Sequence, residues 1–234
     1  MYVKARKRKG GGDVIRTKRV TLFAGHYGSG KTNIAVNYAE YLHKSGFEVV
    51  IADLDIVNPY FRTKDSAERL ENSGIRIISP EYANSNVDLP ALPSELYGVV
   101  ENRSAHAVLD IGGDDRGAYA LGRFTSYILE ENDYEMIFVA NFCRPLTQTP
   151  EEALEVMREI EAAGGIGFTA IVNNTNLGRE TTPKVVYSSA SKAQRLSEIS
   201  GLPVLFTSVE DKIAAEFDMN DVFPLKLQKR YYDI

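Results

Sequence analysis

Residues 25–32 read Gly-His-Tyr-Gly-Ser-Gly-Lys-Thr, which matches the phosphate-binding pattern G-x-x-x-x-G-K-[ST] in full. Small residues let the backbone curl so that several N–H groups point at one phosphate. In this pattern, Lys31 reaches the β- and γ-phosphates of a nucleotide, and the hydroxyl of Thr32 ligates Mg²⁺. The residues that we expect to bind the nucleotide here are Gly25, Gly28, Ser29, Gly30, Lys31, Thr32 and Asn33.

The sequence on both sides of this loop meets the structural requirement of the pattern. A β-prone run, residues 20–24, comes before it. After it, large side chains recur at the spacing of one helix face, namely Ile34, Tyr38, Tyr41 and Leu42. A strand, a glycine loop and a helix N-terminus place the phosphates at the positive end of the helix dipole. We therefore interpret the loop as a nucleotide phosphate site rather than a chance octet.

A second acidic motif follows a later apolar run, residues 106–111. The run ends in Asp110 and is followed by two glycines, so that Asp110 to Gly113 fits D-x-x-G. An acid at the carboxyl end of a strand beside the phosphate loop can hold Mg²⁺, usually through a water molecule. In such motifs the last glycine presents its N–H to a γ-phosphate and moves away after hydrolysis. We therefore expect Asp110 in the metal site and Gly113 in the nucleotide site.

Two more carboxylates end the run 48–52. Asp53 and Asp55 are two residues apart, so in an extended chain they point to the same side and can share a Mg²⁺-centred site. One can approach the metal and the other can orient water, and the alternative is a pair of solvated turn acids. The segment 58–62, Asn-Pro-Tyr-Phe-Arg, comes next and reads as a recognition loop, a moving switch or a hydrophobic plug.

A strand that ends in asparagine, residues 168–172 followed by Asn173 and Asn174, is well placed to contact a nucleotide base. Guanine readers use N-K-x-D, in which the Asp accepts hydrogen bonds from guanine. Here Asn174 stands at the Lys position and Asn176 at the Asp position. The sequence therefore favours ATP over GTP.

Two further features stay open at this point. Arg144 follows the run 136–140 and can contact phosphate or substrate, or be a surface charge. The stretch 80–95 reads as a long loop into a helix, and loops of that length are more often functional than idle. Cys143 is the single cysteine and the three histidines are scattered, which excludes an internal disulfide and argues against a histidine-based metal site.

Charge is uneven along the 234 residues, of which 44% are hydrophobic. Residues 1–19 carry a net charge of +7, so the rest carries −12 of the total of −5. We expect a basic flexible tail over 1–17 and one P-loop nucleotide-binding domain over 18–234. The tail reads as a solubilising leader or as an arm for nucleic acid or anionic lipid. No stretch approaches the roughly 18 apolar residues of a membrane span, so we expect a cytoplasmic protein.

Strand-like and helix-like segments alternate from residue 18 onward. This pattern predicts an α/β fold with three layers: a mostly parallel central sheet of about seven strands with helices on both faces. The expected strands are 18–24, 48–53, 75–79, 106–111, 134–141, 166–173 and 202–207. The expected helices are 30–45, 65–73, 91–103, 116–131, 150–163, 184–199 and 209–216. The clearest helix start is Thr149-Pro150-Glu151-Glu152, which fits a capping box.

The order of phosphate loop, D-x-D strand, D-x-x-G strand and strand with terminal Asn resembles the MinD/ParA-like P-loop ATPases, the CobQ/CobB/MinD/ParA group. The resemblance covers about residues 18–215. It implies that Asp55 positions the attacking water, that Asp110 is the Mg²⁺-linked acid, and that Asn173 or Asn174 contacts the base. It also implies ATP and Mg²⁺ as ligands.

One position departs from that family. MinD and ParA proteins carry a signature lysine directly after the first glycine of the loop, where it reaches the phosphates of a partner subunit. Here the residue is His26, followed by Tyr27. A neutral imidazole does not replace a permanent cation. A nucleotide-dependent homodimer therefore stays possible but gains no support from this residue.

Two classes of function fit these observations. The first is an ATP-hydrolysing switch in which MgATP orders the loops after Asp53 and Gly112, with Lys31 and Asp55 as the catalytic residues. The second is an ATP-dependent small-molecule enzyme, either carboxylate-activating or phosphotransferring, with its substrate near 58–62, 80–95 and Arg144. The sequence names neither a protein partner nor a small-molecule partner.

Overall fold

The chain folds around a parallel β-sheet. The structure is a computed structural model, and it describes residues 17–55, 67, 70–79, 94–101, 103–113, 115–219 and 221–227. The strands within these residues are β1 (Val20–Ala24), β2 (Val49–Leu54), β3 (Arg76–Ile78), β4 (His106–Ile111), β5 (Tyr134–Ala140), β6 (Ala170–Asn173), β7 (Val204–Glu210) and β8 (Val222–Leu225). The helices are α1 (Lys31–Lys44), α3 (Ser94–Glu101), α4 (Asp115–Gly122), α5 (Thr125–Glu131), α6 (Pro150–Gly164), α7 (Pro183–Ser200), α8 (Asp211–Ala214) and the 3₁₀ turn η2 (Gly178–Glu180).

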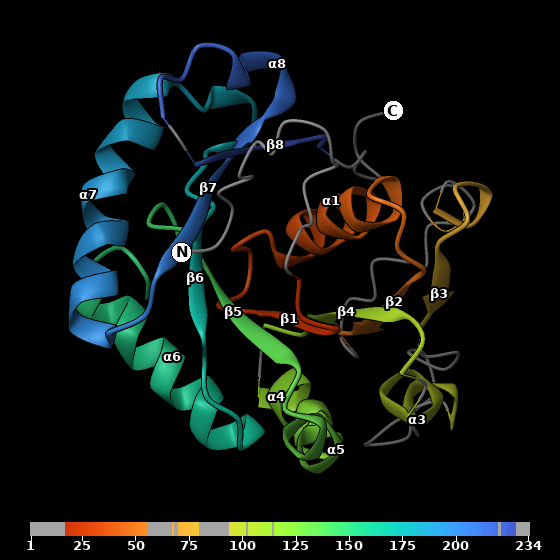
Figure 1. Ribbon diagram of the computed structural model, residues 1–234. Coiled ribbons are helices and arrows are strands. Elements are labelled where there is room, and N and C mark those ends of the chain that lie inside the picture. Colours follow the sequence, from red (N-terminus) through yellow and green to blue (C-terminus); the bar gives the residue numbers. More distant parts are fainter. Residues whose placement is uncertain are drawn as a thin grey trace, which may run out of the picture.

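The strands form one eight-stranded sheet in the order β3-β2-β4-β1-β5-β6-β7-β8. Every neighbouring pair in this order is parallel. Strand β1 lies between β4 and β5, as Figure 1 shows. Because all the strands point the same way, their carboxyl ends share one edge of the sheet, and the loop after β1 lies between the ends of β4 and β5.

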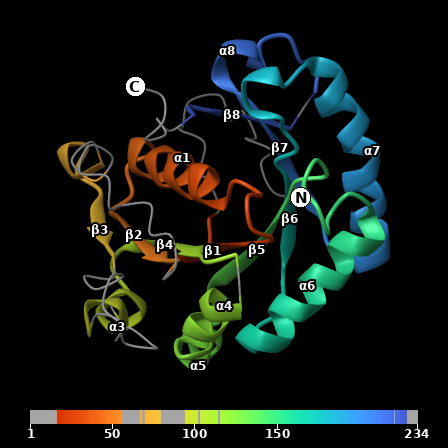
Figure 2. The same ribbon diagram turned by 180° about the vertical axis from the view of Figure 1, so that it is seen from behind.

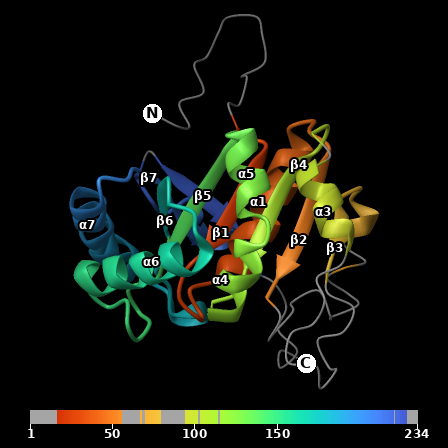
Figure 3. The same cartoon turned by 90° about the horizontal axis from the view of Figure 1, so that it is seen from below.

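Helices cover both faces of this sheet and create two hydrophobic cores. Helix α1 packs on one face, where its apolar residues join Phe23, Ile51 and Val108 in one buried cluster. Helices α4, α5, α6 and α7 contribute to the cluster on the opposite face, around Leu22 and Phe138. Figures 1 and 2 show α1 on one side of the strands and α4 to α6 on the other. In Figure 3, α4 and α6 lie in front of the strands. The predicted three-layer α/β fold is confirmed.

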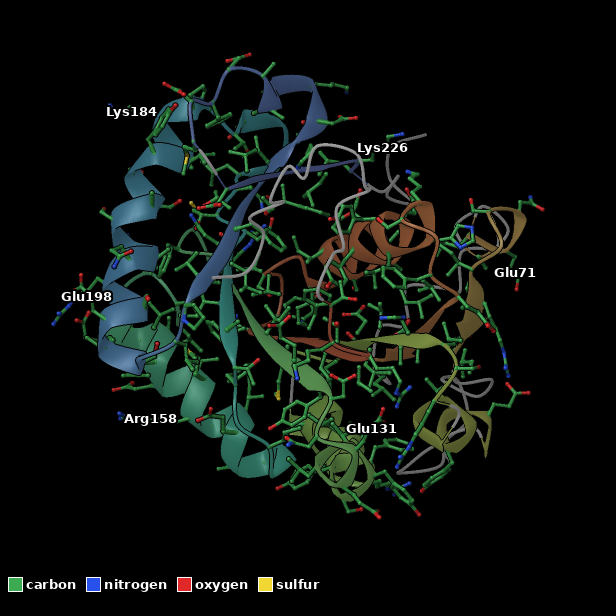
Figure 4. All side chains as sticks on the ribbon, viewed as in Figure 1. Glu71, Glu131, Arg158, Lys184, Glu198 and Lys226 are labelled. Carbon is green, nitrogen blue, oxygen red and sulfur yellow. The ribbon has the colours of Figure 1, made fainter. Side chains whose placement is uncertain are left out.

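The eighth strand is the main difference from the expected sheet. The expected strands end at residue 207, but the segment around Phe223 forms a further strand, β8, beside β7. Pro224 has no N–H to donate to a neighbouring strand, so the sequence of this segment does not predict a strand. Proline is tolerated here because β8 lies at the edge of the sheet. Lys226, the residue after β8, is hydrogen-bonded to α1. Asn37 Nδ2 donates to Lys226 O (3.0 Å), and Lys226 N donates to Asn37 Oδ1 (2.8 Å). Figure 4 shows Lys226 beside α1.

The single helix expected over 116–131 is wrong, because the structure divides it into α4 and α5. Gly122 ends the first helix, and Phe124 turns its ring into the core with 2% of its surface exposed. Phe124 packs there against Tyr97 of α3. Burying this ring stabilises the fold more than one uninterrupted helix would, because tertiary packing overrides helix propensity. No helix within the described part of the chain combines the length and apolarity that crossing a membrane needs.

The capping box at Thr149 is confirmed and gives a stability prediction. Thr149 Oγ1 accepts from Glu152 N (3.2 Å), and the Glu152 carboxylate accepts from Thr149 N (3.1 Å). Thr149→Ala is expected to lower the free energy of unfolding by about 1 kcal/mol in urea denaturation. Thr182 is the matched control, since it is the N-cap of α7 but makes no side-chain cap bond. Equal losses for Thr149→Ala and Thr182→Ala would contradict the capping argument.

Candidate nucleotide-binding site

The predicted phosphate loop lies between β1 and α1. Helix α1 begins at Lys31, and its N-cap Gly30 has the left-handed φ of 90°. A Cβ atom at Gly30 would lie 2.2 Å from Asn174 Nδ2, and one at Gly25 would lie 2.7 Å from Val139 O. Both distances are shorter than real Cβ contacts, so only glycine fits at these two positions. The glycines of the motif therefore have a steric cause in this fold.

The inner side of the loop gathers donors. Ser29 N donates to His26 O (3.1 Å), which closes a turn, and Lys31 Nζ donates to the same carbonyl (3.4 Å). Lys31 is 7% exposed and Ser29 is 1% exposed. The buried hydroxyl of Ser29 has no hydrogen-bond partner within the part of the chain that the structure describes. An ammonium, backbone N–H groups and a spare hydroxyl at a helix N-terminus form an environment that suits an anion.

Two side chains hold the outer side of the same loop. Asn174 Nδ2 donates to Ser29 O (2.6 Å), and Asn174 Oδ1 accepts from Ser208 Oγ (2.5 Å). Arg144 Nε donates to Gly28 O (3.0 Å). The sequence allowed two interpretations of Arg144, a ligand contact or a surface charge. The structure adds a third role, a hydrogen bond to the loop backbone. Sequence reasoning missed Ser208, because no motif marks a serine on β7 as a partner of the phosphate loop.

Two buried acids stand beside the loop at the carboxyl edge. Asp53 on β2 and Asp110 on β4 are register partners, and they are 0% and 1% exposed. Thr32 Oγ1 donates to Asp110 Oδ2 at 2.6 Å. Burial raises the pKa of Asp110 to about 6, while Lys31 and the Thr32 hydrogen bond act to lower it and Asp55 to raise it. The structure thus brings together the phosphate loop and the acid of the D-x-x-G motif.

The residues present fit a magnesium ion. Asp110 Oδ1 is buried and has no hydrogen-bond partner among the described residues, so an oxygen ligand at this edge has spare capacity. Thr32 and Asp110 offer only oxygen atoms, which Mg²⁺ prefers, and Mg²⁺ commonly takes its other ligands from phosphates and water. No group of three or more His, Cys, Asp or Glu side chains in the described ranges forms a metal site by itself. A metal here would therefore depend on bound phosphates.

Asp53 and Asp55 differ in their surroundings. Asp53 is fully buried, which argues against the reading of both as solvated turn acids, whereas Asp55 is half-buried. Asp55 N donates to Asp53 Oδ1 (2.9 Å). The assignment of Asp53 to the metal and of Asp55 to the attacking water stays a prediction. The segments 58–62 and 80–93 lie outside the described residues.

Gly113 lies against the phosphate loop. A Cβ atom there would lie 2.7 Å from Lys31 Nζ and 2.8 Å from Tyr27 N. Gly113→Ala is therefore expected to displace the loop or the ammonium and to weaken nucleotide binding about tenfold, since overpacking of this kind costs roughly 1–3 kcal/mol. Calorimetric titration with MgATP measures the change. Gly98→Ala on α3 is the control, because a Cβ atom at Gly98 meets nothing within 4 Å. Unchanged affinity in Gly113→Ala would exclude a close role for this glycine.

The two asparagines after β6 use their amides within the protein. Asn173 is fully buried, with Nδ2 donating to Ser189 Oγ (2.8 Å) and Oδ1 accepting from Thr175 Oγ1 (2.7 Å). Asn174 is 3% exposed and braces the phosphate loop. Asn176 closes a local turn, since its Oδ1 accepts from Gly178 N (3.1 Å). A contact of Asn173 or Asn174 with the base stays a prediction.

Comparisons with known proteins agree with this fold. No family model and no curated protein matches the chain. Among solved structures, the chain is similar to the cell division protein FtsY of Thermotoga maritima, with 17% identity, a TM-score of 0.57 and coverage of 81% of this chain and 61% of that one.

Two further FtsY structures are similar. That of Mycoplasma mycoides has 14% identity, a TM-score of 0.55 and coverage of 81% and 59%. The signal recognition particle receptor FtsY of Elizabethkingia anophelis, in complex with GDP, has 18% identity, a TM-score of 0.51 and coverage of 81% and 57%. The chain thus spans about three fifths of the length of the FtsY chains. At these identities the likeness concerns the fold alone, which is the P-loop NTPase α/β fold.

Proposed function

We propose that this protein binds MgATP at the P-loop and hydrolyses it, and that it acts as a nucleotide-driven switch of the MinD/ParA type. The observation that carries this proposal is the hydrogen bond between Thr32 and Asp110 (2.6 Å), with Asp110 Oδ1 buried beside it and without a hydrogen-bond partner in the described ranges. Thr32 and Asp110 are 78 residues apart in the sequence, and a nucleotide site requires that their two motifs lie together. Their hydrogen bond joins the phosphate loop to the acid of D-x-x-G. A chance glycine turn has no reason to meet a buried carboxylate in this way.

The residues of the loop would bind the triphosphate. Lys31 and the backbone N–H groups of residues 28–32 supply positive charge and donors, and the dipole of α1 adds to both. Thr32 and Asp110 would hold Mg²⁺, which when bound neutralises charge on the phosphates. Ser29, Lys31 and Asp110 are buried before any nucleotide binds, which supports a site that needs little reorganisation on binding.

Asp55 and Gly113 would make hydrolysis a switch. Asp55 is near enough to raise the pKa of Asp110 and is half-buried at the end of β2, where it can orient water. Gly113 contacts the loop at Tyr27 and Lys31, and the preceding Gly112 packs directly on Gly117 of α4, where a Cβ atom would lie 2.5 Å from Gly112 Cα. A contact between Gly113 and the outer phosphate would therefore be transmitted to α4 when it forms or breaks.

The choice of ATP rests on the residues after β6. The position at which guanine readers carry an Asp is Asn176, and its side-chain oxygen is engaged with Gly178 N. An amide does not offer the pair of carboxylate acceptors that guanine recognition uses. One of the similar FtsY structures contains GDP, so GTP is the competing ligand that an experiment needs to include.

Calorimetric titration of MgATP, MgADP and MgGTP into the wild-type protein tests the proposal. We expect MgATP to bind and MgGTP to bind at least about tenfold more weakly, a difference of about 1.4 kcal/mol. Equal or tighter binding of MgGTP would overturn the base assignment and keep the P-loop site. Absence of binding by all three nucleotides would overturn the proposal itself.

A hydrolysis assay separates a switch from a small-molecule enzyme. A switch is expected to release phosphate slowly alone, because its turnover waits for a partner protein. A small-molecule enzyme is expected to show phosphate release that depends on an added metabolite. Fast release without any addition would contradict the switch.

A further inference from the structure

Arg144 is placed against the phosphate loop by residues 141–149, the segment that follows β5. Its Nε donates to Gly28 O at 3.0 Å, and the side chain is half-buried. Gly28 has a φ of 75°, and a Cβ atom there would lie 3.6 Å from Arg144 Nε. The arginine therefore lies directly over the tip of the loop rather than in open solvent.

This contact fixes the direction of one peptide group. The structure describes no cis peptide bond, so the C=O of Gly28 and the N–H of Ser29 point in opposite directions across their shared plane. Arg144 holds the carbonyl outward. The Ser29 N–H consequently points inward, where it meets His26 O (3.1 Å), the same atom that Lys31 Nζ contacts (3.4 Å). The inner side is the side where the proposed function places the phosphates.

The segment that carries Arg144 is itself well fixed at its start. Thr147 Oγ1 donates to Asn141 O (2.8 Å), and Cys143 N donates to Asn141 Oδ1 (3.0 Å). Leu146 has a φ of 62°, a left-handed conformation that costs a non-glycine residue roughly 1–2 kcal/mol. Such a conformation persists only where the surrounding contacts impose it. The backbone on both sides of Arg144 is therefore held in one arrangement.

Three contacts tie the segment to its neighbours. Phe142 N donates to Thr175 Oγ1 (3.1 Å), the residue that follows Asn174. Lys192 Nζ of α7 donates to Gln148 O (2.8 Å) and lies 5.9 Å from the centre of the Phe142 ring. The arginine is thus carried by a loop that Thr175, just after β6, and helix α7 both brace.

We propose that Arg144 is a positioning residue for nucleotide binding, which holds the Gly28–Ser29 peptide in the turn that Ser29 N closes on His26 O, beside the Lys31 ammonium. The proposal rests on the proposed function of the P-loop. It assigns the effect to the Nε–H donor and not to the charge of the guanidinium. Arg144 acts through the loop backbone and needs no contact with the nucleotide.

Three substitutions separate the donor from the charge. In Arg144→Gln, the side-chain nitrogen is the same number of bonds from Cα as the arginine Nε, so the donor is kept and the charge is lost. In Arg144→Met, that position is a methyl group and both are lost. In Arg144→Lys, the charge is kept but the donor is moved. Arg195→Met on α7 is the control, since Arg195 is 56% exposed and pairs only with surface acids among the described residues.

Two readouts test these variants. MgATP affinity is expected to fall about three- to tenfold in Arg144→Met, the range for one net hydrogen bond, and to stay near wild type in Arg144→Gln and Arg195→Met. In the nucleotide-free protein, the ¹⁵N–¹H resonance of Ser29 is expected to shift and its amide to exchange faster in Arg144→Met. Both changes should be reversed in Arg144→Gln.

The outcomes are distinguishable from failure of the proposed function. Wild-type protein that binds no nucleotide overturns the proposed function, and the Ser29 resonance still decides whether Arg144 holds the peptide. If Arg144→Met binds MgATP as tightly as the wild-type protein does, the positioning role alone is overturned. If MgATP affinity is near wild type in Arg144→Lys but reduced in Arg144→Gln, the positioning role is overturned in favour of an effect of the charge.

Discussion

Replacement of Lys31 by alanine is expected to weaken MgATP binding about 10- to 100-fold and to lower the rate of hydrolysis by a factor of about 10² to 10³. Lys31 is 7% exposed, and its ammonium lies at the inner side of the loop with His26 O. A hydrogen bond from a buried cation to phosphate is among the stronger interactions available to a protein. Calorimetry measures the affinity, and release of inorganic phosphate measures the rate.

Lys44→Ala is the matched control for this substitution. Lys44 is on the same helix, α1, but its side chain is 68% exposed and pairs with Glu40 at 3.4 Å, an interaction typical of a solvated helix face. We expect no measurable change in nucleotide affinity for Lys44→Ala. Similar losses in both variants would point to damage of α1 rather than to loss of a phosphate contact. An active Lys31→Ala protein would contradict the proposed site.

Local sequence was sufficient for the groups of the phosphate site because their geometry is itself local. Residues 20–34 encode their own strand, turn and helix start, and the fold confirms all three. Asp110 could be placed beside Thr32 because parallel strands bring their carboxyl ends to one edge, a rule that needs no knowledge of the particular pairs. The observed hydrogen bond between the two residues follows from strand order β4-β1.

The contacts that sequence reasoning missed depend on long-range packing. Ser208, Asn174 and Ser29 form a chain of hydrogen bonds across more than 170 positions of sequence, and no periodic pattern encodes such a chain. The break between α4 and α5 depends on the burial of the Phe124 ring in the hydrophobic core. The strand β8 is short and contains proline, so only its neighbours reveal it. Tertiary context decides each of these three cases.

Asp110→Asn is expected to stabilise the nucleotide-free protein while it removes function. Because burial raises the pKa of Asp110 from its ordinary value of 3.8 to about 6, the folded state binds the proton more tightly than the unfolded state does. The stabilising contribution of the protonated acid is fully present below about pH 4 and is lost as the pH rises through about 6. At pH 7 the ionised carboxylate therefore costs about 3 kcal/mol, from roughly 1.4 kcal/mol for each pKa unit.

An amide at this position carries no charge to bury, so the difference between variant and wild type should follow that titration. Urea denaturation in EDTA is expected to give Asp110→Asn a higher free energy of unfolding at pH 7, by up to about 3 kcal/mol, and a difference that shrinks toward pH 4. Asp218→Asn, at an exposed aspartate, should show no such pH-dependent difference. Mg²⁺-dependent phosphate release by Asp110→Asn should fall by about 10² to 10³. A variant that is less stable at pH 7 would show that the carboxylate is retained for structure, and one that hydrolyses ATP normally would exclude Asp110 from the metal site. A more stable and inactive variant would show that the wild-type protein keeps a destabilising charge because the metal needs it.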